Sequence, residues 1–129
     1  MASSMELADD GNVYLMRHSP TGPVYVIAPS GQVLKRIALS PPEGSYLSEI
    51  KVSHQELAAE YIRPKPSSHE ISAVVIQIVD LQSGEPVAEY SHADGEIGSA
   101  FACYSADNLT FLVKDDKGSL MIAQTAITP

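Results

Sequence analysis

The sequence predicts an all-β protein made of short antiparallel strands, and two observations support this prediction. Apolar residues come in short runs rich in Val, Ile and Tyr, without the three-to-four-residue spacing of an amphipathic helix. Turn-forming segments such as "DDGN", "PSGQ" and "DDKG" separate the runs. A chain of 129 residues is long enough for one domain, residues 1–129, with a buried core.

Composition and charge narrow the classes of partner. Hydrophobic residues make up 44% of the chain, as in ordinary globular proteins. The net charge is −8 and the basic residues are scattered, so we expect no nucleic-acid partner. No apolar run approaches the ~20 residues of a membrane helix, so we expect no membrane partner. The opening "MASSMELADD" lacks the pattern of a signal peptide, which makes the cytoplasm the default location.

The apolar runs predict the strands in order along the chain. The first group is Glu6–Ala8, Asn12–Arg17, Val24–Ala28 and Val33–Leu39. The second group is Tyr46–Ser53, Leu57–Arg63, Ala73–Leu81 and Val87–Tyr90. The third group is Ser99–Ser105, Leu109–Val113 and Ser119–Ile127. The segment "HQELAAEYI" has helix-forming residues, but its place in the pattern favours a strand.

The three groups of strands show a weak internal repeat. "VSHQELAAEYI" aligns with "YSADNLTFLVK", which matches Leu57 with Leu109. "VYVIA" aligns with "IQIVD" at the same spacing, and the following turns match with a slip of one residue, Gly31 against Gly84. These alignments predict repeat-like units at residues 5–40, 45–91 and 98–129, each a four-stranded antiparallel meander or part of one.

A meander of ~40–50 residues is the size of one β-propeller blade. The small or acid-bearing turns after the first strands and the turn "VDLQSGEPV" after the third strand resemble blades of WD-repeat, NHL and YVTN-like propellers. The sequence departs from these families in lacking the "WD" and "GH" dipeptides, and "SHQE" replaces the expected "SxDG" turn. The resemblance implies propeller-type meanders stacked face to face.

Propellers close with about four to eight blades, whereas this chain holds fewer than three. The expected fold is therefore an incomplete propeller of all-β meanders, either as part of a longer propeller or as a homodimer in which two chains complete the ring. A β-sandwich or barrel of about ten strands is the alternative fold.

A meander sends alternate loops to opposite ends, and one end collects three of the four histidines and six of the acids. The ligand-binding candidates on this loop face are His18, His69, Glu70, His92, Asp94, Glu96, Asp115 and Asp116. Binding residues often lie on loops carried by a rigid scaffold. His54 falls in a tight turn at the opposite end, where we expect a turn role.

The motifs do not single out a reaction. No "HExxH", "GxSxG" or phosphate-loop spacing is present, so we assign no catalytic residue, metal ligand or cofactor. The favoured function is a non-enzymatic binding or scaffold module for a protein or small ligand. The alternative is part of a propeller enzyme of hydrolase or lyase type, for which the resemblance implies His69, His92, Asp94 and Glu96. Cys103, the single cysteine, lies among apolar residues and is expected to be a buried packing thiol.

Overall fold

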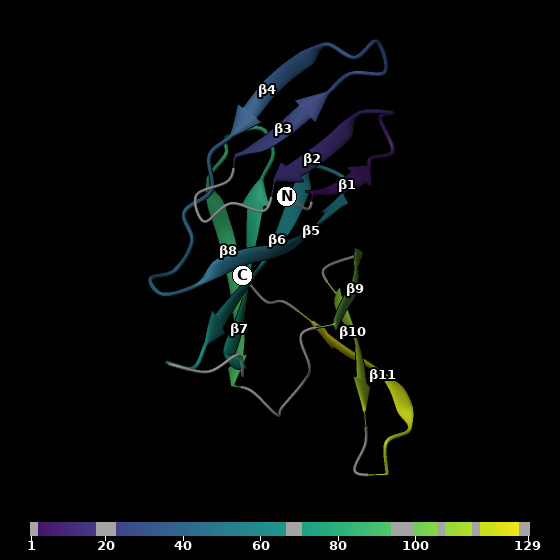
Figure 1. The fold of residues 1–129 in the computed structure, drawn as a ribbon. Helices are drawn as coiled ribbons and strands as arrows, with labels where there is room; N and C mark the ends of the chain where they lie inside the picture. The colour runs from purple at the N-terminus through teal and green to yellow at the C-terminus, as the bar shows by residue number, and fades with distance from the viewer. Residues whose placement is uncertain are drawn as a thin grey trace.

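The computed structural model describes residues 3–17, 23–66, 71–93, 100–105, 108–114 and 117–126. Within these ranges every regular element is a β-strand (Figure 1). The strands form three antiparallel meanders of four, four and three strands, and the sheets do not close into a ring. The all-β prediction is confirmed. The ambiguous segment "HQELAAEYI" contributes to β6, which pairs along its length with strands on both sides.

The first sheet contains four strands: β1 (Ser3–Leu7), β2 (Val13–Arg17), β3 (Val24–Ile27) and β4 (Val33–Ile37). Tight turns join β1 to β2 and β3 to β4. In the turn from β3 to β4, the N–H of Gly31 donates to the carbonyl of Ala28 at 2.8 Å. Gly31 has a φ of 90°, a backbone conformation that side chains disfavour and glycine adopts freely.

The second sheet has longer strands and lies in the middle of the stack. Its strands are β5 (Tyr46–Ser53), β6 (Glu56–Pro64), β7 (Ile71–Asp80) and β8 (Pro86–Ala93). The turn after β7 repeats the Gly31 arrangement with one extra residue, because the N–H of Gly84 donates to the carbonyl of Asp80 at 2.8 Å. That extra residue accounts for the slip between the two turns in the sequence alignment.

The third sheet contains β9 (Ala100–Ser105), β10 (Asn108–Lys114) and β11 (Leu120–Ala126), with β10 in the centre. The pairing of β9 with β10 shifts by one residue between Thr110 and Phe111. The shift puts Phe101 and Tyr104 on the buried face and turns Cys103 outward, where it is exposed. The expectation of a buried Cys103 was wrong because a bulge interrupts the alternation of strand faces.

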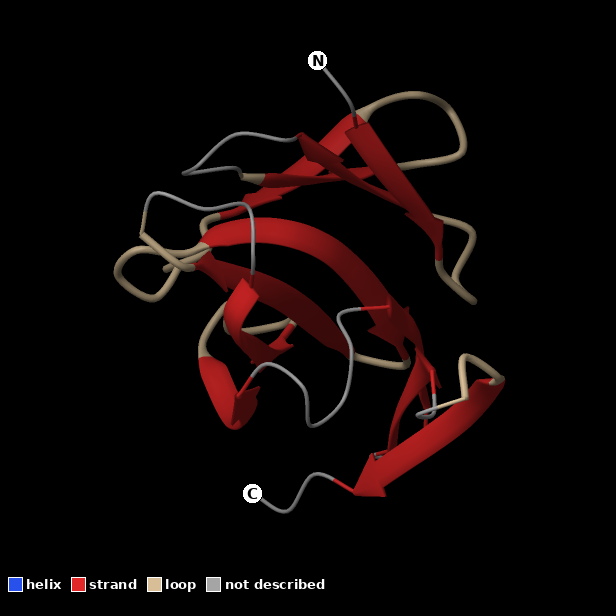
Figure 2. Cartoon of the chain, turned by 60° about the horizontal axis from the view of Figure 1, so that its bottom comes forward, coloured by secondary structure: helices blue, strands red, loops and turns tan. Residues whose placement is uncertain are grey.

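The three sheets stack face to face, with the second sheet between the other two (Figure 2). One core fills the space between the first and second sheets: Tyr14, Met16, Val24, Val26 and Ile37 meet Leu47, Ile50, Leu57, Ala59, Tyr61 and Val75. Alternate residues along each strand enter this core, as the two-residue period of a strand requires.

A second core covers the opposite face of the middle sheet. Ala58, Val74, Ile76 and Ile78 pack there against Phe101, Tyr104, Leu109 and Phe111 of the third sheet. The rings of Phe101 and Phe111 lie 5.5 Å apart between centroids. The middle sheet is thus apolar on both faces, which explains why β6 and β7 read as nearly continuous hydrophobic runs.

Neighbouring sheets come closest at their first strands. The backbone of β5 approaches that of β1 on one side and that of β9 on the other, and β2 also approaches β5. Sheets stacked about 10 Å apart have room for side chains between them, and here the spacing narrows at the first strands. This arrangement is compatible with blade-like sheets.

Candidate functional site

The loop face expected from the sequence falls largely outside the described residues. His18, His69, Glu70, Asp94, Glu96, Asp115 and Asp116 all lie outside them. The backbone of His92 pairs with Val74 near the end of β8, but its side chain is also outside the description. The grouping of these candidates therefore stays a prediction, and so does the enzyme alternative that depends on them.

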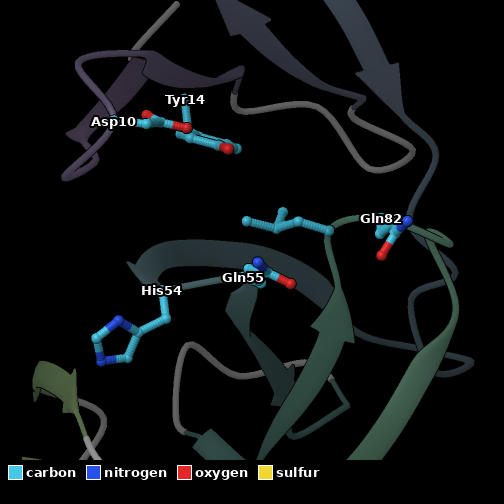
Figure 3. Close-up of a pocket in the computed structure, with 6 residues that line it drawn as sticks. Asp10, Tyr14, His54, Gln55 and Gln82 are labelled. Atoms are coloured by element: carbon cyan, nitrogen blue, oxygen red, sulfur yellow. The ribbon is translucent and has the colours of Figure 1, made fainter.

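A pocket of about 350 Å³ opens at the opposite end of the sheets, between the first and second sheets. Figure 3 shows Asp10 and Tyr14 on one side of it and His54, Gln55 and Gln82 on the other. The sixth lining residue is Leu81. Three turns build the pocket: the turns after β1, β5 and β7.

The two turns of the middle sheet are fixed to each other and to the first sheet. The N–H of Leu81 donates to the carbonyl of Gln55 at 2.8 Å. The ammonium of Lys35, on β4, donates to the carbonyl of Leu81. His54 has a φ of 55°, so the turn role expected for it is compatible with the backbone that places it beside the pocket. The pocket wall is therefore held by backbone hydrogen bonds as well as by packing.

The first sheet supplies the acidic side of the pocket. Both carboxylate oxygens of Asp10 accept hydrogen bonds from Asn12, one from its backbone N–H at 2.9 Å and one from its side-chain amide at 3.2 Å. These bonds orient the carboxylate within its turn. Burial raises the pKa of Tyr14, and the charge of Asp10 adds to the rise. The phenol therefore stays protonated at neutral pH.

Asp80 stabilises the turn that carries Leu81 and Gln82. Its carboxylate accepts a hydrogen bond from the backbone N–H of Ser83 at 2.9 Å. This bond is the main reason that the pKa of Asp80 is lowered, and the Ser83 side chain and the charge of Lys35 also contribute. Asp80 is therefore an ionised turn residue close to the pocket, not a proton donor.

The lining groups suit binding better than covalent chemistry. One carboxylate, one imidazole, one phenol and two amides surround an apolar Leu81 side chain, and the described lining includes no serine or cysteine. In the described part of the chain, no group of three or more His, Cys, Asp or Glu side chains is arranged to hold a metal ion. Apolar walls with a few oriented polar groups are typical of small-ligand sites.

A buried acid lies elsewhere, on the face of the middle sheet that looks toward the third sheet. Glu60 is fully buried, and neither carboxyl oxygen has a hydrogen-bond partner among the described residues. Burial raises its pKa from 4.5 to about 8, and the negative charge of Glu49 adds to the rise. The Ser48 side chain and the positive charge of Lys51 lower the pKa and offset part of this rise. Lys51 itself forms an ion pair with Glu49, with 2.9 Å between Nζ and Oε1.

The third sheet is also tied to the middle sheet by a polar contact. The Tyr104 hydroxyl donates to Oε1 of Glu56 at 2.8 Å. Glu56 begins β6, directly after the His54–Gln55 turn. The contact therefore links the third sheet to the same end of the middle sheet that carries the pocket.

The pocket lies at the end of the sheets opposite to the loop face predicted from the sequence, and the grouping of the candidates on that loop face stays a prediction. A signal was available: "DDGN", "SHQE" and "LQSGEP" all connect strands at one end of the predicted meanders. The offset between neighbouring sheets decides whether turns of different sheets meet, and no local pattern in the sequence indicates that offset.

Comparisons with protein-family models, with curated proteins and with solved structures find no match for this chain. None of the described segments forms an apolar helix of membrane-spanning length.

Proposed function

We propose that the chain is a non-enzymatic binding module built from propeller-type blades, and that its binding site is the pocket between the first and second sheets. The observation that carries the proposal is the convergence of three turns from two sheets on one pocket lined by Asp10, Tyr14, His54, Gln55, Leu81 and Gln82. Rigid sheets that present polar groups from their turns are a common basis for binding sites.

The stacked sheets support the propeller-type part of the proposal. Each sheet is a meander, consecutive sheets pack face to face, and their first strands lie closest together. Blades of a propeller approach one another in this way around a central axis. Further sheets are required to complete a ring.

The lining chemistry favours a ligand group that is cationic and rich in hydrogen-bond donors. Asp10 supplies the negative charge, and the amides of Gln55 and Gln82 supply neutral acceptors. Leu81 offers an apolar contact for an aliphatic stem. A guanidinium or ammonium group on a short aliphatic chain, as in a basic side chain of a peptide, matches this combination.

The test is an NMR titration of ¹⁵N-labelled protein with N-acetyl-arginine methylamide, using N-acetyl-glutamine methylamide as the uncharged comparison. We expect saturable shifts at the pocket residues with the arginine probe and much weaker ones with the glutamine probe. Asp10→Asn keeps the side-chain size and removes the charge, so it should weaken binding by about tenfold or more.

Asp9→Asn is the matched control, because Asp9 is an exposed neighbour that does not line the pocket. It should leave the affinity nearly unchanged. Equal losses in the two variants indicate general attraction to an acidic protein and refute the site. The absence of saturable shifts at the pocket residues refutes it as well.

A further inference from the structure

Each sheet has two faces, and strand register makes the faces comparable from sheet to sheet. We call one face of each sheet its upstream face and the other its downstream face. The upstream face of the middle sheet packs on the first sheet, and that of the third sheet packs on the middle sheet. In the first sheet, the upstream face is the one turned away from the middle sheet. Leu57 pairs with Val52 in the middle sheet, Leu109 with Tyr104 in the third, and Val13 with Leu7 in the first. Each pair flanks the turn between the first two strands, so the pairs occupy equivalent positions.

These upstream positions are buried wherever a preceding sheet covers them. Ile50 of β5 is 1% exposed and Phe101 of β9 is 3% exposed. Met5 of β1 occupies the equivalent position, because its partner Leu15 lies at the same place in the second strand as the partners of Ile50 and Phe101. Met5 is nevertheless 70% exposed. Leu7 is 74% exposed, although Tyr104 at the same position is buried. The upstream face of the first sheet is thus apolar and uncovered in the described structure.

The opposite, downstream face shows the complementary pattern. Met16 of β2 and Val24 of β3 are fully buried against the middle sheet. The corresponding positions of the third sheet are Leu112 of β10 and Ile122 of β11, which pair with each other. Leu112 is 45% and Ile122 70% exposed. Among the described residues, nothing covers the downstream face of the third sheet as the next sheet covers the downstream faces of the first and second sheets.

We propose that the upstream face of the first sheet packs on the downstream face of the third sheet in a second copy of this chain. Both interfaces within the chain join an upstream face to a downstream face, and the proposed contact continues that stack with the two unmatched faces. This inference rests on the blade-like arrangement of the proposed function, but not on the pocket or its ligand.

The composition of the upstream face of the first sheet fits this pairing. The upstream face carries Met5, Leu7, Val13, Leu15, Ile27 and Val33, which makes a contiguous apolar ladder by register. Exposed apolar patches of this kind mark association surfaces.

Charge favours joining unlike faces over joining two upstream faces. Arg36 lies over the ring of Tyr25 on the upstream side, 5.4 Å from its centroid. Two upstream faces in contact bring two arginines together, whereas the downstream face of the third sheet offers the polar pair Gln124 and Thr110. The contact is therefore heterologous, and it yields a closed ring when the rotation between copies permits.

The first experiment measures solution mass by light scattering coupled to size exclusion. Wild-type protein should elute as a dimer of the 13.8 kDa chain or a larger closed multiple, with mass falling on dilution. Leu7→Lys on the upstream face and Ile122→Lys on the downstream face should each give a monomer. Val87→Lys is the matched control, because Val87 is an exposed apolar residue on β8, in the middle sheet, and should leave the mass unchanged.

Mixing the two monomeric variants gives the decisive result. Each retains the face that the other has lost, so an equimolar mixture should form a two-chain complex that neither variant forms alone. A wild type that stays monomeric at its highest soluble concentration overturns the proposal. So does an Ile122→Lys variant that still self-associates, because that outcome means that like upstream faces pair.

Three further measurements separate the association test from misfolding and from the pocket. Circular dichroism checks that each variant is folded. If Leu7→Lys or Ile122→Lys fails to fold, Met5→Gln and Leu112→Gln take the places of these two variants. Cys103 pairs with Thr110 on the downstream face and is exposed, so its thiol should react more slowly when wild type associates than in Leu7→Lys. An unchanged reaction rate contradicts burial of that face. The arginine titration is run on monomeric Leu7→Lys, so failure at the pocket leaves the mass result intact.

Discussion

Replacing Glu60 with glutamine should change how the stability of this protein depends on pH. The side chain is fully buried between the middle and third sheets, and its carboxyl oxygens have no hydrogen-bond partner among the described residues. Glutamine has nearly the same shape and no charge to lose. The substitution therefore isolates the cost of ionising a buried acid.

The direction of the pH effect on stability follows from the raised pKa of Glu60. Burial raises the pKa of Glu60 from 4.5 to about 8, so the folded protein holds a proton that the unfolded chain releases near pH 4.5. The stability that comes from this bound proton is fully present below pH 4.5 and is lost as pH rises toward 8. One pKa unit corresponds to about 1.4 kcal/mol, so the total change is about 5 kcal/mol.

The assay is urea unfolding of wild type and Glu60→Gln at closely spaced pH values from acid to mildly alkaline. The free energy of unfolding of the variant should exceed that of wild type by an amount that grows by about 1.4 kcal/mol per pH unit and levels off near pH 8. Glu89→Gln, at an exposed position on β8, controls for the loss of one negative charge.

A constant difference between wild type and Glu60→Gln across this pH range refutes the reasoning. A carbon-13 NMR titration of the Glu60 carboxyl provides a direct check, because a midpoint near 4.5 shows that the group is hydrated or paired in solution. A slope of equal size in Glu89→Gln assigns the effect to net charge instead of burial.

Three further predictions concern one turn and the core between the middle and third sheets. Asp80→Asn should lower stability at neutral pH, because its pKa is lowered by hydrogen bonds from the following turn; in urea titrations the deficit should shrink as pH falls below 3.8. Phe111→Ala should cost about 3–5 kcal/mol in the same assay, whereas Val87→Ala on an exposed surface should cost about 0.5 kcal/mol or less. Tyr104→Phe removes the hydrogen bond to Glu56 and should lower the free energy of unfolding by about 1–3 kcal/mol; an unchanged value means that water replaces the bond.

Local patterns in the sequence were enough to predict the strands. Short apolar runs and turn residues predicted β2 and β10 to within a residue or two, and the repeat alignment matched positions that the registers of β6 and β10 make equivalent. Even the prediction of a strand at β6 was correct, although its residues favour a helix. Strand formation depends on neighbours in sequence and on pairing with adjacent strands, and both leave traces in a single chain.

The sequence by itself determined the all-β class and the order of strands and turns. Tertiary structure decided which faces are covered: stacking buries Glu60 and Tyr61, and the bulge in β9 exposes Cys103. It also brought the turns around Asp10 and His54 together into a pocket. The physical reason is that the alternation along a strand defines two faces without saying what lies against either. Each face is covered by a sheet that is distant in sequence, and no local pattern encodes how far neighbouring sheets are offset from each other.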